Sequence, residues 1–305
     1  MGRVLSIEET GVPENQVAKE GREFHFTKAD FARVCKLIYD HAGISLSESK
    51  QELVYSRLSR RLRATGIHTF AEYLRLLEGN DAAEWEAFTN SLTTNLTSFF
   101  REPHHFAILA EQVKALRGKH PISLWCSASS TGEEPYSMAM TVLDALGREA
   151  SQVSIVATDL DTNVLATARE GVYPEERIAK LSPDLVKRYF LRGTGAQAGM
   201  VRVRQELRDM ITFRQLNLLH DNWPIRGPLD AIFCRNVMIY FDKPTQLAIL
   251  KKFVPLLRRE GLLYAGHSES FHHADAYFKL RGKTVYELSA QARSHCAVDD
   301  ARQRR

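Results

Sequence analysis

Apolar residues recur with helical spacing in the first third of the chain. The sequence Thr27-Lys28-Ala29-Asp30 is a possible capping box, and apolar positions follow it at Phe31, Val34, Leu37 and Ile38. Gly43 ends this helix, and further helical patterns cover residues 47–65, 70–78 and 82–96. No strand pattern intrudes, so residues 24–95 are expected to form a small all-helical domain.

From about residue 96 onward, short apolar runs of strand length alternate with helical patterns. The predicted strands are residues 122–126, 153–159, 229–234, 261–265 and 284–288, and the predicted helices are 134–146, 163–169 and 243–257. This alternation predicts an α/β fold with a doubly wound, mostly parallel sheet that helices cover on both faces. No obvious crossover helix precedes the last strand, which is therefore expected to be an antiparallel edge.

A glycine-rich stretch interrupts the alternation at about residues 190–216. Apolar and polar residues alternate over Met200–Arg204 and, more loosely, over 210–213. We expect a small antiparallel β insertion here, either a structural flap or a binding platform, within a second domain that covers residues 96–290. The termini are expected to be a disordered leader, residues 1–23, and a polar tail, residues 291–305.

Composition restricts the class of protein. Of the 305 residues, 44% are hydrophobic and 26% are charged, which is typical of a soluble globular protein, and no apolar run reaches the roughly 18 residues of a membrane span. The N-terminal stretch is not a signal peptide, and the four cysteines lack disulfide or metal spacing, so a reducing cytoplasm is expected. A net charge of +4 is too small to argue for nucleic acid. His104 and His105 are adjacent, which is not the spacing of a metal site on one helix face, so no metal is expected.

The chain is organised around residues 122–143, which predict a buried strand, a tight turn of small residues and a helix. Ligands of open α/β sheets bind at such turns, where small residues allow close approach to the backbone. This turn has one glycine, Gly132, instead of the GxGxxG spacing of dinucleotide sites, and Glu133 and Glu134 follow it. Two carboxylates would repel a phosphate and attract an ammonium or sulfonium group. Alternatively, they only cap the helix.

Other polar residues are predicted to reach the same edge of the sheet. Asp159 ends the second strand, where an acid commonly accepts hydrogen bonds from a ribose, or else caps the next helix. If residues 210–213 are counted as the third strand and 229–234 as the fourth, the pairs Asn217-Leu218 and Arg235-Asn236 follow the third and fourth strands. An asparagine amide suits the edge of an adenine, but it is also a common turn residue.

The second predicted helix carries a basic face. Its arginines lie opposite an apolar arc of Val54, Tyr55, Leu58 and Leu62, at positions Arg57, Arg60, Arg61 and Arg63. Such a face is either simply solvated or a docking surface for an acidic partner.

Five motifs, in this order, closely resemble the chemotaxis receptor methyltransferases (the CheR family). They are Asn95-Leu96-Thr97-Ser98-Phe99-Phe100-Arg101-Glu102, Ser130-Thr131-Gly132-Glu133-Glu134-Pro135-Tyr136-Ser137, Thr158-Asp159-Leu160-Asp161, Phe233-Cys234-Arg235-Asn236-Val237-Met238-Ile239-Tyr240-Phe241 and Ala265-Gly266-His267-Ser268-Glu269. The resemblance runs from about residue 25 to 290 and includes the helical domain and the insertion.

The resemblance implies that the cofactor is S-adenosylmethionine and that S-adenosylhomocysteine is its product. Glu134 would hold the α-amino group, in agreement with the charge argument, and Asp159 would bind the ribose. The other implied contacts are Asn217 and Leu218 beside the adenine, Arg235 and Asn236 closing the pocket, and Asn95, Thr97 and Arg101 over the methionine end.

The family methylates specific glutamate side chains on the helical cytoplasmic bundle of chemoreceptors, forming methyl esters that tune adaptation in chemotaxis. A glutamate is already ionised at pH 7 and the sulfonium methyl is already activated, so no strong base is required. Alignment and exclusion of water remain for the protein. We expect Arg101 to orient or neutralise a carboxylate near the sulfonium, and Tyr240 to hydrogen-bond the incoming glutamate.

The resemblance also implies two receptor contacts. Arg57, Arg60 and Arg63 would dock on the receptor bundle. The insertion would bind a C-terminal receptor peptide as an extra strand along Met200–Arg204, with contacts from Arg192, Gly193, Gly195 and Arg202. The protein is expected to be a monomer that neither binds nucleic acid nor enters a membrane.

Two alternatives stay open. A binding module that senses S-adenosylmethionine or a receptor tail without transferring methyl is opposed by the intact set Arg101, Glu134, Asp159, Asn236 and Tyr240. A nucleic-acid methyltransferase of the same fold would want an Asn/Asp-Pro-Pro-aromatic motif where this chain has Arg235-Asn236-Val237-Met238.

Overall fold

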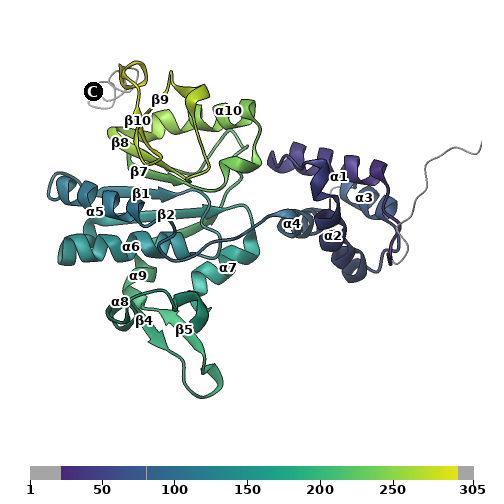
Figure 1. Ribbon diagram of the computed structural model, residues 1–305, viewed down its shortest axis with the longest axis horizontal. Helices are drawn as coiled ribbons and strands as arrows, with labels where there is room; N and C mark the ends of the chain where they lie inside the picture. Colours follow the sequence, from purple (N-terminus) through teal and green to yellow (C-terminus); the bar gives the residue numbers. More distant parts are fainter. Residues whose placement is uncertain (1–21, 80, 295–305) are drawn as a thin grey trace, which may run out of the picture.

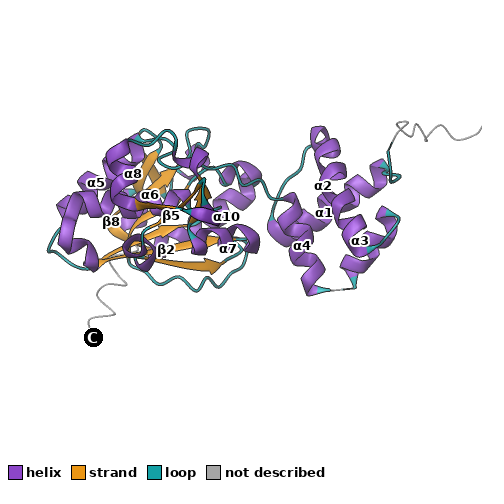
Figure 2. Ribbon diagram, turned by 90° about the horizontal axis from the view of Figure 1, so that it is seen from below, coloured by secondary structure: helices purple, strands orange, loops and turns teal. Residues whose placement is uncertain are grey.

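The computed structural model describes residues 22–79 and 81–294. A body of helices and a larger α/β body lie side by side, joined by an extended segment after residue 92 (Figures 1 and 2). Most of the predicted leader and tail falls outside the described residues. The start of the tail is ordered, since Arg293 N–H donates to the carbonyl of Ser289 and Ala292 is buried. None of the described helices is long and apolar enough to cross a membrane.

The helical domain contains the four helices that the apolar pattern predicted, although the last of them ends at residue 92 and not at residue 96. They are α1 (Lys28–Ala42), α2 (Gln51–Thr65, preceded by a 3-10 turn at Glu48–Lys50), α3 (Phe70–Glu78) and α4 (Ala82–Leu92). The capping box is confirmed, because Thr27 Oγ1 accepts from Asp30 N–H while Asp30 Oδ2 accepts from Thr27 N–H, both at 3.0 Å. Val34, Leu58 and Phe88 are fully buried in one shared core.

The larger domain is built on a seven-stranded sheet in the order β6-β2-β1-β7-β8-β10-β9. Its strands are β1 (Ile122–Cys126), β2 (Val153–Asp159), β6 (Ile211–Gln215), β7 (Leu229–Cys234), β8 (Leu257–Ala265), β9 (Phe278–Gly282) and β10 (Val285–Leu288). Strands β6, β2, β1, β7 and β8 are parallel, and β10 is antiparallel to both its neighbours. The predicted mostly parallel sheet is confirmed.

The edge position predicted for the last strand is wrong. Strand β10 lies between β8 and β9, and β9 is the edge. The sequence prediction omitted β9, whose residues after Phe278 are exposed and include Lys279 and Arg281. An exposed, basic strand lacks the apolar alternation on which the prediction relied. Such charges also protect a sheet edge from pairing with another chain.

Helices cover both faces of this sheet. One apolar cluster joins β1 and β2 to α5 (His104–Leu116) and α6 (Glu133–Leu146), and another joins β7 and β8 to α10 (Lys243–Phe253). Helix α7 (Thr162–Glu170) follows β2. Helix α5 was not predicted, although Phe106, Leu109 and Val113 give it a buried face.

An antiparallel β insertion is present, as predicted, but its strands are not all the predicted ones. Its three strands, in the order β3-β5-β4, are β3 (Val172–Pro174), β5 (Met200–Val203) and β4 (Phe190–Arg192), with α8 (Pro183–Tyr189) before β4 and α9 (Gln205–Asp209) after β5. The second segment assigned to the insertion, 210–213, belongs to β6 of the large sheet. Local alternation indicates a strand but not its partner, so the sequence placed this segment wrongly.

The small sheet is fastened to the rest of the domain. The ring of Phe99, in the segment between the domains, makes edge contacts with Tyr173 of β3 and Phe190 of β4 at 5.3 Å between centroids. Tyr173 Oη donates to the carbonyl of Thr131 at 2.6 Å. The two ends of the insertion meet where Val203 N–H donates to the carbonyl of Gly171 at 2.8 Å.

Candidate active site

A cavity of about 670 Å³ lies at the carboxyl ends of β1, β2 and β7, and the helical domain and the segment joining the domains form its outer wall. This is the edge at which open α/β sheets bind ligands. All residues predicted to contact the cofactor or act in catalysis line it: Asn95, Thr97, Arg101, Glu134, Asp159, Asn217, Leu218, Arg235, Asn236 and Tyr240. A second cavity, of about 640 Å³, shares only Asn217 with this set.

The turn after β1 brings the backbone close to the cavity. Ser127, Ala128 and Ser130 line it. Gly132 has a φ of +100°, and a Cβ atom there would lie 2.9 Å from both Ala168 Cβ and Tyr173 Oη. Glycine is therefore required both by the backbone conformation and by the close packing.

The structure separates the two neighbouring acids of this turn. Glu134 lines the cavity, whereas Glu133 does not. The Glu133 carboxylate accepts from Thr131 Oγ1 at 2.6 Å and lies 3.4 Å from Arg177 Nη1. Of these two acids, only Glu134 is placed to receive a cation from the cavity.

Glu134 is held by a buried ion pair. Arg235 Nη1 donates to Glu134 Oε2 at 2.6 Å, and Cys126 Sγ donates to Oε1 at 3.2 Å. The Arg235 side chain is fully buried, and its Nη2 donates to the carbonyl of Arg101 at 2.5 Å. Burial raises the pKa of Glu134, while the charge of Arg235 favours the carboxylate form.

Glu102 extends this network toward the surface. Its Oε2 is 3.4 Å from Arg235 Nη2, and its Oε1 lies 3.0 Å from Nδ1 of the exposed His267. Burial opposes ionisation of Glu102, but the hydrogen bond from His267 and the charge of Arg235 outweigh it and lower its pKa to about 2. Glu102 is thus a carboxylate at any physiological pH, and it helps to fix Arg235.

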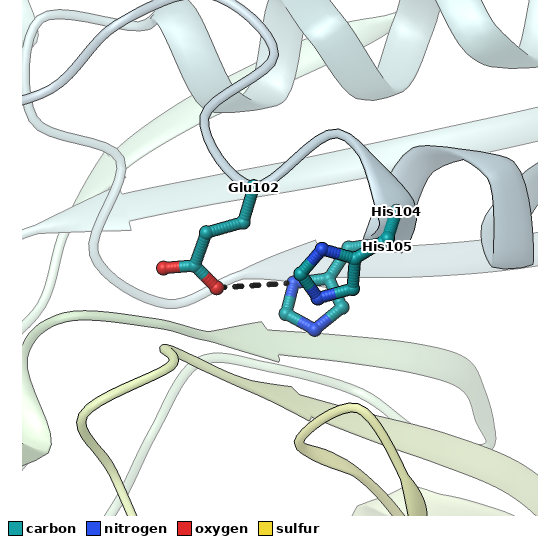
Figure 3. A group of neighbouring side chains, drawn as sticks. All are labelled: Glu102, His104 and His105. Carbon is teal, nitrogen blue, oxygen red and sulfur yellow. Dashed lines mark ion pairs between the residues drawn. The ribbon is translucent and has the colours of Figure 1, made fainter.

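Glu102, His104 and His105 also form a group that could ligate a metal, with ligand atoms within 4.8 Å of one another (Figure 3). His105 Nδ1 lies 3.6 Å from Glu102 Oε2, and His105 Nε2 is 2.8 Å from the carbonyl of Lys283. Burial lowers the pKa of His105 to about 4. We assign Glu102 to the ion-pair network instead, because the charge of Arg235 beside it opposes a cation there. The absence of a metal stays a prediction.

Asp159 is the acid at the end of β2. Its Oδ2 accepts from Ser130 N–H at 2.7 Å and its Oδ1 from Asp161 N–H at 3.0 Å. Burial raises its pKa to about 6, against the effect of these backbone hydrogen bonds. The next helix is capped by Asp161, whose Oδ1 accepts from Asn163 N–H, so the alternative role of Asp159 as that cap is wrong.

The segment joining the domains is tied to the turns that surround the cavity. Asn95 Nδ2 donates to Asp161 Oδ2 at 2.8 Å, and the carbonyl of Thr97 accepts from Arg177 Nη1 at 3.2 Å. Arg101 Nη1 donates to the carbonyl of Leu96 at 2.8 Å. Within residues 22–79 and 81–294, Arg101 has no ion-pair partner, so its charge is available to an anion in the cavity.

Asn217 and Tyr240 connect the cavity to the helical domain. Asn217 Nδ2 donates to the carbonyl of His41 at 2.7 Å, and its Oδ1 accepts from Leu219 N–H at 2.9 Å. Tyr240 Oη donates to the carbonyl of Thr94 at 3.4 Å. The amide of Asn217 is therefore engaged in the turn and the domain contact, which leaves any contact with adenine to the rest of this residue and to Leu218.

Sequence reasoning missed the buried Glu269. Its carboxylate accepts the N–H groups of Asn236 at 2.9 Å, Met238 at 2.8 Å and Gly266 at 2.5 Å. It thus shapes the loop that holds Arg235 and Asn236, and Asn236 adopts a φ of +58° there. The sequence contained a signal for Glu269, because it ends one of the five motifs that carry the family resemblance, just as Glu102 ends another.

The residues predicted to bind receptor lie outside the cavity. Arg57 donates to the carbonyls of Leu92 and Thr93 at 3.0 and 2.7 Å, and Arg63 pairs with Glu23 at 2.5 Å. Arg60 is exposed and has no partner in the part of the chain that the structure describes. The predicted docking face is thus only partly free.

The contacts predicted in the β insertion are exposed, apart from the half-buried Gly193. Arg192 Nη1 lies 3.3 Å from Glu175 Oε1, and Arg202 is an exposed residue of β5. The predicted pairing of a peptide along Met200–Arg204 is wrong, because β5 is the central strand and both its edges already pair with β3 and β4. Gly195 has a φ of +57°.

Comparison with known proteins agrees with this geometry. Residues 95–287 match the family model for the CheR methyltransferase SAM-binding domain, and residues 29–93 match that for the CheR methyltransferase all-alpha domain. The match to a SAM-binding domain model, over a sheet with a cavity at the carboxyl ends of its strands, shows that the chain is an S-adenosylmethionine-dependent methyltransferase. Within that class, the chain belongs to the CheR methyltransferase family.

Several relatives resemble the chain over most of their length. It is 54% identical over 276 residues to a chemotaxis protein methyltransferase of Klebsiella aerogenes, covering 90% of this chain and 94% of that protein. It is 55% identical over 262 residues to one of Salmonella typhimurium, covering 86% and 90%. It is also 55% identical over 266 residues to chemotaxis protein methyltransferase 2 of Pseudomonas aeruginosa, covering 87% and 95%.

Proposed function

We propose that this chain transfers the methyl group of S-adenosylmethionine to glutamate side chains of chemoreceptors, giving glutamate methyl esters and S-adenosylhomocysteine, and that it does so as a monomer in the cytoplasm. The observation that carries the proposal is that one cavity contains both an acidic and a basic side chain suited to the two ligands. Glu134 suits the ammonium of the cofactor, and the unpaired Arg101 suits a carboxylate.

The residues fit the cofactor in chemistry as well as in place. Asp159, with its carboxylate at the end of β2, is suited to accept from a ribose diol. Leu218 and Leu160 offer apolar surface to the adenine. Ser127 and Ala128 leave room beside the backbone. When bound, S-adenosylmethionine supplies a methyl group that its sulfonium already activates.

The chain therefore has to align and to shield the reacting groups. Arg101 orients the substrate carboxylate and stabilises its charge while the site excludes water. Tyr240 Oη, now bonded to the carbonyl of Thr94 at a long 3.4 Å, is free to turn toward that carboxylate. No side chain needs to remove a proton, since glutamate is ionised near neutral pH.

Substitution of Arg101 and Tyr240 tests this assignment. We expect Arg101→Ala and Tyr240→Phe to lower methyl transfer at least tenfold while changing cofactor affinity by less than about threefold. Tyr39→Phe is a matched control, because Tyr39 Oη donates to Asp242 at 2.7 Å across the same domain contact but lies outside the cavity. Equal losses of transfer and affinity would refute the catalytic assignment.

Calorimetry followed by a transfer assay tests the function itself. The protein is titrated with S-adenosylmethionine and S-adenosylhomocysteine and then incubated with receptor and methyl-labelled cofactor. Base-labile label on receptor glutamates supports the proposal. Cofactor binding without transfer supports the alternative of a non-catalytic binding module, and no cofactor binding overturns the proposed methyl transfer.

The receptor bundle and a receptor C-terminal peptide are the proposed partners. Of the α2 arginines, the structure favours Arg60 as the free docking charge. For the peptide we propose β4 as the pairing strand. Gly193 N–H donates to the carbonyl of Met200 and the carbonyl of Tyr189 accepts from Arg204 N–H, so the alternation of an antiparallel pair turns the N–H group of Arg192 outward. The N–H group of Phe190 is already used, because it donates to the carbonyl of Val186 at the end of α8. Pro174 makes the β3 edge less suitable.

A proline substitution tests this edge. Arg192→Pro removes an outward N–H group without removing an inward one, so it should abolish calorimetric binding of a receptor C-terminal peptide. Arg192→Ala controls for the side chain and its contact with Glu175. Unchanged peptide binding by the proline variant would exclude β4, and absence of binding by the wild type would exclude the tether.

A further inference from the structure

Two exposed apolar side chains stand at the mouth of the cofactor cavity. Leu96 is 78% exposed and Ile239 is 51% exposed, and both line the cavity of about 670 Å³. The other large hydrophobic side chains that are exposed in the described part of the chain, Tyr39, Leu191 and Leu280, do not line it. A high exposure combined with a place in the cavity wall puts Leu96 and Ile239 on its rim.

The backbone behind these side chains is firmly held. The carbonyl of Leu96 accepts from Arg101 Nη1 at 2.8 Å. Ile239 lies in a 3-10 turn whose Met238 N–H donates to the buried Glu269 and whose Met238 carbonyl accepts from Gln246, both at 2.8 Å. The structure therefore presents both apolar side chains on fixed supports.

The two segments are also tied to each other. Tyr240, next to Ile239, donates to the carbonyl of Thr94, two residues before Leu96. Leu96 and Ile239 thus belong to one rim around one opening.

The charged side chains around this opening that lack an acidic partner in the described residues are positive. Lys50 is exposed on the rim, and Arg101 lies within the wall; neither has an ion-pair partner in the described residues. The acids of the wall, Glu134 and Asp159, lie at the carboxyl ends of the strands and are engaged there. A suitable occupant therefore brings a negative side chain into the cavity and an apolar surface onto the rim.

We propose that Leu96 and Ile239 form the seat for the substrate helix and select its residues one turn before and after the target glutamate. This rests on the proposed methylation of chemoreceptor helices. On a helix, residues three and four positions from the glutamate share its face and lie roughly 5–6 Å away. With the glutamate in the cavity, these neighbours meet Leu96 and Ile239, which favour small or apolar side chains. A cationic side chain there would lose water beside Lys50 and Arg101 without gaining a partner.

Substitutions on the rim test the proposal through the receptor rather than the cofactor. Leu96→Ser and Ile239→Ser should each lower kcat/KM for receptor about tenfold, mainly through KM, while the calorimetric affinity for S-adenosylmethionine stays within twofold of wild type. Leu280→Ser, on the exposed edge strand β9, is the matched control and should leave both quantities unchanged.

A paired exchange makes the test specific. A receptor variant with Lys three or four residues from the target glutamate should be a poor substrate for the wild type, and Leu96→Glu or Ile239→Glu should restore its methylation at least fivefold.

Provided that the wild type methylates receptor, two results would overturn the rim assignment. One is that the rim variants methylate receptor like the wild type, and the other is that they lose cofactor affinity as much as they lose methylation. If the wild type methylates no receptor, the proposed function fails and the rim assignment falls with it.

Discussion

Arg235 and Glu134, which are 101 residues apart in the chain, form a 2.6 Å ion pair beneath the cavity. The same guanidinium donates to the carbonyl of Arg101 and faces Glu102. One buried side chain thus connects the start of α6, the segment between the domains and the loop after β7. A change in this pair is expected to affect both the cofactor pocket and the fold.

Glu134→Gln keeps the shape of the side chain and removes its charge. Because the buried Arg235 then loses its closest partner, we expect the free energy of unfolding in urea to fall by roughly 3 kcal/mol. Affinity for S-adenosylmethionine should fall at least tenfold in calorimetry. Glu133→Gln is the matched control and should retain wild-type affinity; if it loses as much as Glu134→Gln, the ammonium site is assigned to the wrong acid.

Cofactor affinity should depend on the ionisation of Asp159. Its pKa is about 6 in the free protein, because the carboxyl group is buried. A ribose diol donates to the carboxylate form, so binding favours loss of the proton, and affinity should rise with pH up to about 7 and fall roughly tenfold from pH 7 to pH 5. Calorimetry across this range measures the slope. Asp159→Asn should bind weakly with little pH dependence, and an unchanged slope in this variant would exclude Asp159 as its cause.

Two glycines with positive φ should respond differently to alanine. Gly132→Ala adds a Cβ that meets Ala168 and Tyr173 at 2.9 Å, so we expect a loss of roughly 3 kcal/mol in stability together with weaker cofactor binding. Gly66 has a φ of +71° with no atom near its added Cβ, so Gly66→Ala should cost about 1 kcal/mol. Urea unfolding compares them, and equal losses would show that backbone strain alone accounts for Gly132.

The α2 arginines should divide into structural and docking residues. Arg57→Ala removes hydrogen bonds to the carbonyls at the end of α4 and should cost about 1–2 kcal/mol of stability. Arg60→Glu should leave stability within about 0.5 kcal/mol of wild type and slow receptor methylation several-fold. Thermal unfolding and a methylation assay at low salt separate the two. Normal methylation by Arg60→Glu would remove α2 from the docking surface.

Removal of metal should not affect the enzyme. The carboxylate of Glu102 is already compensated by Arg235 and His267, so we expect dialysis against EDTA to leave methyl transfer and thermal stability unchanged. Elemental analysis of the purified protein should show less than a stoichiometric amount of zinc. A loss of activity that zinc restores would instead assign Glu102, His104 and His105 to a metal site.

Local patterns predicted the helical domain closely. The bounds of α3 agree with the prediction, because its buried residues Phe70, Leu74 and Leu77 repeat at helical spacing. The capping box before α1 is likewise a signal contained in four consecutive residues. Such features depend on neighbours in the chain and can be identified without knowledge of the fold.

Features that depend on distant pairing were harder to predict. Strand β3 has only three residues, and β5 does not reveal in its own sequence that it pairs on both sides. The ends of the predicted strands pointed to Asp159 and to the pairs Glu133-Glu134 and Arg235-Asn236. The family resemblance chose Glu134 and supplied the remaining site residues, and the structure brings these to one cavity. The engagement of Asn217 with His41 and of Arg57 with the end of α4 could not be anticipated, because each partner belongs to another element.

The contact of Phe99 with Tyr173 and Phe190 has a consequence for protein engineering. Since the ends of the β insertion meet at Gly171 and Val203, the insertion resembles a unit that could be exchanged between homologues to test the proposed binding of a receptor peptide. The aromatic contact argues otherwise, because the ring that it holds belongs to the wall-forming segment of the catalytic domain. A functional chimera would have to keep an aromatic pair at the positions of Tyr173 and Phe190, because without it the exchanged insertion would no longer hold the ring of Phe99 and the wall of the cavity beside it.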